Sequence, residues 1–225
     1  MNEDKPILSI ETSNSICGAC VYFSDTKFFE SQIYLKNSHA EKLFETIDYV
    51  IHAAGIETGD LGGIAVSSGP GSFTGLRIGL SAAKGIAFGS SLPIIPVPTY
   101  EAMALQLSSI LPAGSEFIIA NKVNMEEIYY AKFKINLNNY IFVENLQIVN
   151  HDDFRKLAKD TLTFGNVDLD NSGDNIENRN IFAAPSPKYV AIWSKTFCAD
   201  LTNFNYEYLE PNYLKKFIIK ERKNG

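Results

Sequence analysis

The chain has 225 residues, of which 45% are hydrophobic, enough to bury a core in one large domain or two small ones. Its formal net charge of -6 argues against a protein that binds tRNA or DNA alone, because phosphate contacts require Lys and Arg. Three cysteines cannot form a full set of disulfides, which favours buried thiols over a disulfide framework. The segment 1–6 is short and charged and has no apolar signal-peptide core, and no apolar run approaches roughly 18 residues. We therefore expect a cytoplasmic protein.

The first part of the chain predicts three strands joined by short turns. We expect the strands at Ile7–Ile10, Ile16–Phe23 and Phe28–Leu35, which together form an antiparallel meander. The first turn, Glu11–Ser15, consists of polar residues only.

A helix is predicted next, over Ser38–Ala54. It begins with an S-x-x-E capping box, in which Ser38 and Glu41 satisfy backbone N–H groups of the first turn. His39 lies in the first turn of this helix, a position that favours a solvated side chain or an interface contact over metal binding. His52 and His151 have no spacing to it that a metal site would require.

The most distinctive stretch is Ser67–Gly79, with the sequence SSGPGSFTGLRIG. Leu61–Val66 before it predicts a buried strand, and Leu76–Phe88 after it predicts a helix. Gly69 and Gly71 therefore lie at a strand-to-helix turn, where backbone N–H groups and the helix dipole can hold an anion. The stretch matches neither the Walker pattern nor the dinucleotide fingerprint. A tight turn that packs a helix on a sheet explains these glycines equally well.

Small residues recur on this helix at Gly75, Gly79, Ala82 or Ala83, and Ala87. Such a ridge lets another segment approach closely. It indicates either internal packing or a dimer seam.

The remaining elements are predicted less sharply, and the chain ends in a basic tail. Lys215, Lys216, Lys220, Arg222 and Lys223 favour a solubilising tail over an RNA-binding one. The other expected elements are strands at Ile94–Val97, Phe117–Ala120, Ile128–Ile135 and Tyr140–Val149, helices at Thr99–Ile110, Asp152–Lys159 (capped by Asp152 or His151) and Pro187–Asp200, and a mobile polar loop at Val167–Asn180.

Taken whole, the stretch Ser67–Gly79 resembles the signature of the TsaB (YeaZ) family, the smaller paralogues of TsaD. Ile7–Ser15, Ser38–Leu43 and Pro98–Ala104 also resemble segments of that family, so the resemblance covers about the first 110 residues well and the remainder loosely. It implies an α/β protein with the actin-like, ribonuclease H-like (ASKHA) fold. We expect two subdomains, each a mixed sheet flanked by helices: residues 1–110, and a smaller, degenerate one at residues 111–225.

The resemblance implies a non-catalytic subunit that heterodimerises with and activates TsaD. With the ATPase TsaE, the pair would support threonylcarbamoyladenosine (t6A) modification of tRNA, which this chain would reach only through the complex. Alone, it would form a homodimer, because burying an exposed apolar helix surface against a second copy is favourable. No cofactor is expected to bind tightly, and ATP or ADP is the candidate ligand at the partner interface.

The resemblance also assigns candidate residues. The catalytic paralogues bind a metal through an H-x-x-x-H pair, whereas this chain has Thr99 and Met103 there, so neither a metal site nor a catalytic residue is expected. Glu11 stands where relatives have an Asp that organises metal and phosphate. The candidate nucleotide or anion loops contain Glu11, Thr12, Ser13, Gly69, Gly71 and Ser72. The candidate partner interface on the first two helices contains His39, Leu43, Ile47, Phe73, Leu76, Arg77 and Leu80, several of which must face the core instead.

Two enzymatic alternatives remain. A small actin-like ATPase or phosphotransferase acting alone would use Glu11–Ser13 and Gly69–Ser72, but only Glu11 is placed to hold magnesium, where a carboxylate pair is usual. A peptidase is disfavoured because the chain contains neither an H-E-x-x-H motif nor a G-x-S-x-G elbow.

Overall fold

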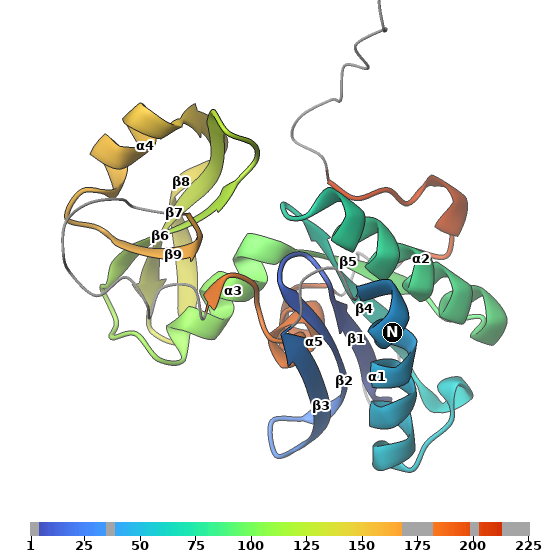
Figure 1. Cartoon of the computed structure of the whole chain (residues 1–225). Coiled ribbons are helices and arrows are strands. Elements are labelled where there is room, and N and C mark those ends of the chain that lie inside the picture. The colour runs from blue at the N-terminus through green and yellow to red at the C-terminus, as the bar shows by residue number, and fades with distance from the viewer. Residues whose placement is uncertain (1–4, 35–38, 168–181, 199–202, 213–225) are drawn as a thin grey trace, which may run out of the picture.

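A computed structural model describes residues 5–34, 39–167, 182–198 and 203–212. These residues form two mixed sheets with helices packed against them (Figure 1). The expected α/β class is therefore confirmed. In the described part of the chain, no helix is both long and apolar enough to cross a bilayer.

The first sheet has the strand order β3-β2-β1-β4-β5. Strands β1 (Ile7–Glu11), β2 (Ile16–Ser24) and β3 (Lys27–Tyr34) form the predicted antiparallel meander. Strands β4 (Gly63–Gly69) and β5 (Ile94–Pro98) extend it in parallel from β1. All five residues of β1 are buried, which places β1 at the centre of the sheet with both faces covered.

Helices cover both faces of this sheet. On one face, α1 (His39–Ala54) and α2 (Phe73–Ser90) pack on alternate residues of β1 and β2, and the short helix η1 (Thr58–Asp60) precedes β4. On the other face lie α3 (Thr99–Ser108) and α5 (Pro187–Phe197). Helix α2 begins three residues before the predicted Leu76. Ser38, the predicted cap of α1, lies outside the described residues.

The second sheet has the strand order β8-β7-β6-β9. Strands β6 (Glu116–Lys122), β7 (Glu127–Asn136) and β8 (Asn139–Asn150) are antiparallel neighbours, as their sequence pattern predicts. Helix α4 (His151–Ala158) then leads to β9 (Leu162–Asn166), which runs parallel to β6 and was not predicted. The predicted mobile loop lies almost wholly outside the described residues.

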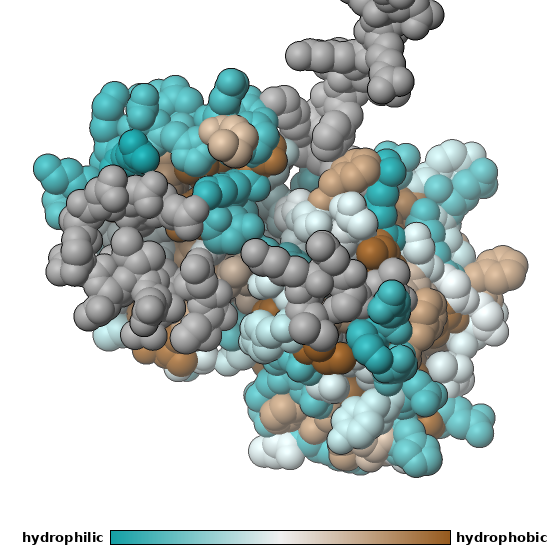
Figure 2. Space-filling view, in the orientation of Figure 1, coloured by the Kyte–Doolittle hydropathy of each residue, from teal (hydrophilic) through white to brown (hydrophobic). Residues whose placement is uncertain are grey.

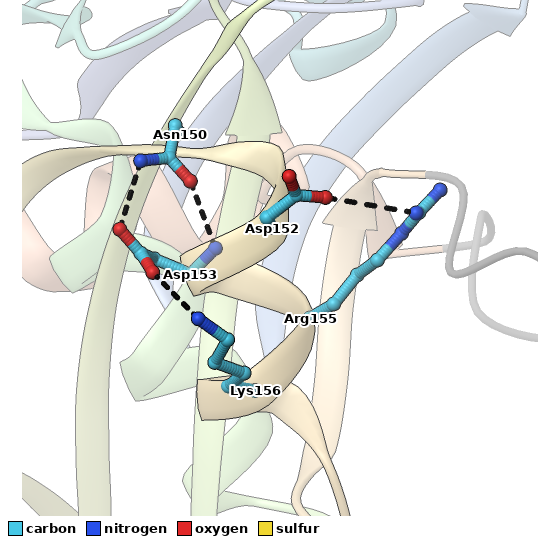
Figure 3. Close-up of polar contacts among 5 residues, drawn as sticks. All are labelled: Asn150, Asp152, Asp153, Arg155 and Lys156. Carbon is cyan, nitrogen blue, oxygen red and sulfur yellow. Dashed lines mark hydrogen bonds and ion pairs between the residues drawn. The ribbon is translucent and has the colours of Figure 1, made fainter.

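Helix α4 is capped by Asn150, not by Asp152 or His151 as predicted. The Asn150 side chain accepts a hydrogen bond from the backbone N–H of Asp153 at 2.8 Å and donates one to its carboxylate at 2.8 Å (Figure 3). Ion pairs one turn apart, Asp153 with Lys156 at 3.2 Å and Asp152 with Arg155 at 3.9 Å, follow the cap. Because the cap accepts an otherwise unsatisfied N–H, the helix starts one residue earlier than predicted.

Helix α3 lies between the two sheets (Figure 1). Ala102 and Leu105 pack on the first sheet, and Met103 and Leu107 pack on the second. Tyr140 of β8 donates a hydrogen bond to Glu101 of α3 at 2.6 Å and accepts one from the indole of Trp193 at 2.9 Å. One phenol therefore joins β8, α3 and α5. The division at residue 110 stays a prediction of the sequence, and α5 from the second half packs on the first sheet.

Removing the Tyr140 hydroxyl should destabilise the protein. In Tyr140→Phe, the Trp193 N–H and the Glu101 carboxylate both lose a partner in a half-buried place, so we expect a loss of about 1–3 kcal/mol. Denaturant unfolding measures this loss. Tyr208→Phe, at an exposed ring in the short helix η4 (Tyr206–Tyr208), is the matched control and should change little. Equal stability of both variants would contradict the role of the hydroxyl.

Candidate functional site

The glycine-rich turn after β4 packs against the polar turn after β1. The backbone N–H of Ser72 donates to the carbonyl of Ser13 at 2.6 Å, and the Thr12 hydroxyl donates to the carbonyl of Gly75 at 2.8 Å. A Cβ added at Gly71 would collide with Ser13, and one added at Gly75 or Gly79 would collide with Thr12. The glycines are therefore required for a close approach between two segments of this chain, which is the packing interpretation left open by the sequence.

Ser72 also caps α2. Its hydroxyl accepts a hydrogen bond from the N–H of Gly75 at 3.2 Å. Two of the amide groups that could cradle an anion, those of Ser72 and Gly75, are thus already satisfied within the protein. Gly69 is buried, and its N–H donates to the Thr99 hydroxyl at 3.1 Å.

Glu11 is buried and points into the protein. Its carboxylate accepts hydrogen bonds from the N–H and the hydroxyl of Ser13, both at 2.5 Å, and from the hydroxyl of Ser67 on β4. Burial raises the pKa of Glu11 to about 7, although the bonds from Ser13 and Ser67 oppose that rise. Glu11 therefore ties the first turn to β4, and the hydroxyl and amide donors offset only part of the cost of burying its charge.

A cleft of about 260 Å³ lies between the two sheets. Of the candidate loop residues, only Gly71 and Ser72 line it, whereas Thr12 and Ser13 are buried beneath them. Its other lining residues are Asn14, Phe73, Asn121, Lys122, Val123, Tyr129 and Asn166.

Three asparagines that line this cleft are hydrogen-bonded to one another. Asn14 donates to the side chain of Asn121 at 3.3 Å, and Asn166 donates to the side chain of Asn14 at 3.3 Å and from its backbone to Asn121 at 3.0 Å. These residues were not predicted as site residues. Asn14 was predicted only as part of a polar turn, and Asn166 belongs to the strand that the sequence did not reveal.

The positions matching the paralogues' metal ligands are used for packing. Thr99 is buried and accepts the Gly69 N–H, and Met103 belongs to the core of the second sheet. Within the described residues, no group of three or more His, Cys, Asp or Glu side chains is arranged to hold a metal ion.

A second hollow, of about 500 Å³, lies between the outer faces of α1 and α2. Arg77 lies over the ring of Phe73 at 3.9 Å, and Phe44 of α1 is 59% exposed. Figure 2 shows hydrophobic residues among polar ones on the face that carries these helices. The lining residues of this groove are Phe44, Phe73, Thr74, Arg77, Ile78, Ser81 and Ala82.

The structure corrects most of the predicted partner interface. Leu43, Ile47, Leu76 and Leu80 are at most 7% exposed, because they face the protein's own core. Phe73 and Arg77 line the groove, and their place in a partner interface stays a prediction, while the His39 side chain lies outside the described residues. Phe44 was missed: α1 has apolar residues on two faces, and sequence alone does not say which face turns inward.

Adding a methyl group at Gly75 should destabilise the protein, because it collides with the Thr12 carbonyl. We expect Gly75→Ala to lose about 1–3 kcal/mol of unfolding free energy by overpacking. Gly85→Ala in the same helix is the matched control: it meets nothing within 4 Å and should gain up to about 1 kcal/mol from helix propensity. Denaturant unfolding of both variants measures the difference, and equal stabilities would contradict the close approach.

Glu11 should make stability depend on pH. Its pKa rises from 4.5 to about 7 on folding, so its contribution is fully present below pH 4.5 and is lost as the pH rises to 7. At about 1.36 kcal/mol per pKa unit, the loss is roughly 3 kcal/mol. We therefore expect the stability of the protein relative to Glu11→Gln to fall by this amount between about pH 4 and pH 8 in urea unfolding. A difference that stays constant over this range would show that the pKa is not raised.

This chain is similar in sequence to a protein family and to several named bacterial proteins. Residues 33–206 match the family model described as "TsaD: tRNA N6-adenosine threonylcarbamoyltransferase". A protein of Escherichia coli strain K12, named tRNA threonylcarbamoyladenosine biosynthesis protein TsaB, is 25% identical over 97% of this chain and 98% of its own length. Proteins of the same name from Haemophilus influenzae and Bacillus subtilis are 29% and 36% identical, over 56% and 44% of this chain. These two matches span about half the length of each relative, 52% and 43%.

Solved structures show the same fold. YeaZ from Pseudomonas aeruginosa superposes with a TM-score of 0.58 at 21% identity, over 64% of this chain and 67% of that one. An uncharacterized protein described as similar to peptidase YeaZ, also from Pseudomonas aeruginosa, reaches 0.71 at 16% identity over 94% and 100%. The strand order and these likenesses confirm the predicted actin-like fold. Because the family model matches more than half of its length, the chain belongs to the TsaD family, and its full-length match places it in the TsaB (YeaZ) branch.

Proposed function

We propose that this chain is a cytoplasmic, non-catalytic subunit for the t6A modification of tRNA, which heterodimerises with TsaD and works alongside the ATPase TsaE. The names of its curated relatives support the pathway. The acidic net charge of -6 supports access to tRNA through the complex and not by this chain alone.

The observation that carries the proposal is the outer face of α1 and α2. Three large apolar side chains on these helices are strongly exposed: Phe44 (59%), Tyr49 (64%) and Phe88 (79%). Of these three, Phe44 lines the groove of about 500 Å³, and an exposed aromatic ring beside a largely apolar groove is typical of a protein interface. The inner sides of both helices are fixed in the core, so this surface is held rigidly for a partner.

The non-catalytic part of the proposal rests on how the chemically useful groups are engaged. The Glu11 carboxylate accepts hydrogen bonds from Ser13 and Ser67, and the Thr99 hydroxyl accepts one from the Gly69 N–H. Met103 is packed in a hydrophobic core. In this arrangement they maintain the fold around the two turns, and TsaD would supply the reacting groups.

We further propose that the same face pairs with a second copy when TsaD is absent, and that ATP or ADP binds at the heterodimer interface. Arg77 and Ser81 line both the groove and a neighbouring hollow of about 270 Å³ that also holds Lys84. These two cations near the partner face could contact nucleotide phosphates. Light-scattering chromatography of this chain with its TsaD, with and without ATP and magnesium, tests the pairing and its nucleotide dependence.

The alternative is an actin-like ATPase acting alone in the cleft between the sheets. Gly71, Ser72 and Lys122 line that cleft, which favours a polar or anionic ligand there. ATP hydrolysis by the isolated chain would support this alternative and count against a purely supporting role.

The face proposed for TsaD is tested by placing a charge on it. Phe44→Glu should weaken binding to TsaD at least about tenfold, because burying a carboxylate in an apolar contact is costly. Its effect on stability should be small, since the Phe44 ring is 59% exposed already. The matched control is Met125→Glu, which is 94% exposed in the turn between β6 and β7 and should bind normally. Unchanged binding of Phe44→Glu would remove this face from consideration.

A further inference from the structure

The groove between α1 and α2 is flanked by an acidic row. Glu41, Phe44 and Asp48 are spaced by three and four residues, so they lie on one side of α1, and all three are exposed. The cations nearby are engaged locally: Lys42 pairs with Glu45 at 2.8 Å, and Arg77 lies over the Phe73 ring. The groove therefore has mostly apolar walls and one lining cation, Arg77, while Glu41 and Asp48 place a carboxylate on either side of Phe44 along α1.

The chain leads back to this groove through the segment 203–212. Asn203 exchanges backbone hydrogen bonds with Ile94 at 2.9 Å, and the Tyr206 hydroxyl donates to the carbonyl of Leu92 at 2.5 Å. At the other end of the segment, the N–H of Asn212 donates to the carbonyl of Ser68 at 2.7 Å. Figure 1 shows this segment in red beside α2. Asn212 is thereby held near the start of α2, where Phe73 and Thr74 open the groove.

The residues after Asn212 have the composition that such a groove would bind. The segment 213–225 contains five basic residues and one acidic residue, with Phe217, Ile218 and Ile219 at its centre. The whole chain carries -6 despite this basic segment, so the rest is more acidic still. An apolar centre between cations matches the Phe44 ring between the carboxylates of Glu41 and Asp48 on α1.

The segment is also long enough. Thirteen residues can span up to about 43 Å when extended. The part of α2 that lines the groove, Phe73 to Ala82, is only about 14 Å long at 1.5 Å per residue. Tethering at Asn212 gives the segment an effective concentration of the order of millimolar, so that weak contacts suffice for binding.

We propose that residues 213–225 bind in the groove between α1 and α2 of their own chain, with Lys side chains on Glu41 and Asp48 and the Phe217–Ile219 centre against Phe44 and Ile78. The segment then competes with any partner for this face and must be displaced before the partner docks. The competition rests on the proposed function only in naming TsaD as that partner.

The first experiment detects the contact in the full chain, without TsaD. A water-soluble carbodiimide joins amines to carboxylates that lie in contact, and peptide mass spectrometry identifies the joined pairs. We expect links from Lys215, Lys216, Lys220 or Lys223 to Glu41 and Asp48. A mixture of 14N- and 15N-labelled protein separates links within a chain from links between copies. Links only between copies, or none to α1, would overturn the proposal.

A pair of carboxylate variants controls for chance proximity. Glu41→Gln with Asp48→Asn should abolish the tail links to α1. Glu126→Gln, which neutralises an exposed carboxylate in the turn between β6 and β7, should leave them unchanged. Persistence of the same yield of α1 links in the double variant, now through other carboxylates, would show that the tail does not recognise this row.

The second experiment measures the competition. Replacing Lys215, Lys216 and Lys220 by Gln in the full chain should tighten binding to TsaD by up to about tenfold, if the tail covers the groove about nine-tenths of the time. The salt dependence of binding should also change, because tail release would no longer break ion pairs. Unchanged affinity together with lost binding to tRNA would show that the tail serves RNA instead, and would overturn the proposal.

The two experiments separate the inference from the proposed function. Tail links to α1 without any TsaD binding would leave the tail contact standing and reject the heterodimer. If TsaD binds through Phe44, no tail links form and the Lys→Gln variant of the tail binds TsaD unchanged, the heterodimer stands and the tail contact is rejected.

Discussion

The structure depends on the close packing of two turns. The turn after β1, with Thr12 and Ser13, packs against three glycines: Gly71 just before α2, and Gly75 and Gly79 within it. Because no side chain of α2 separates them, α2 lies directly against the end of β1, and the bonds from the Ser72 N–H to the Ser13 carbonyl and from the Thr12 hydroxyl to the Gly75 carbonyl fix its position. This contact also fixes the position of Gly71, Ser72 and Phe73, which line the cleft between the sheets.

This packing changes the meaning of a glycine-rich turn at a helix N-terminus. Such a turn can hold an anion because its N–H groups are unsatisfied. Here the Ser13 carbonyl and the Ser72 hydroxyl occupy acceptor positions of that kind, and Glu11 is turned inward to Ser13 and Ser67. The ligand loops of an actin-like protein thereby become a structural joint, which fits a subunit that supports chemistry performed by a partner.

The sequence predicted the first half well because its signals were strong. Alternating or continuous apolar runs located β1 to β5, and small-residue spacing located α2. Strand β9 was missed because two of its five residues, Gly165 (at a φ of +122°) and Asn166, are of types that are uncommon in strands. The interface residues failed for another reason: Leu43 and Phe44 are equally apolar neighbours, and only the packed structure shows that Leu43 turns inward and Phe44 outward. The asparagines of the cleft come from three separate segments that the chain brings together only on folding.

On α1 and α2, the side chains that face the core are different from those that face the groove. Leu43, Ile47, Leu76 and Leu80 hold the helices to the sheet, while Phe44, Phe73 and Ile78 between them face the groove. Substitutions in the first set act on folding, because they open a cavity or bury a charge. Substitutions at Phe44, which is 59% exposed, act on whatever occupies the groove and leave the core intact. Any occupant of the groove would therefore leave the packing of the core side of the two helices unchanged.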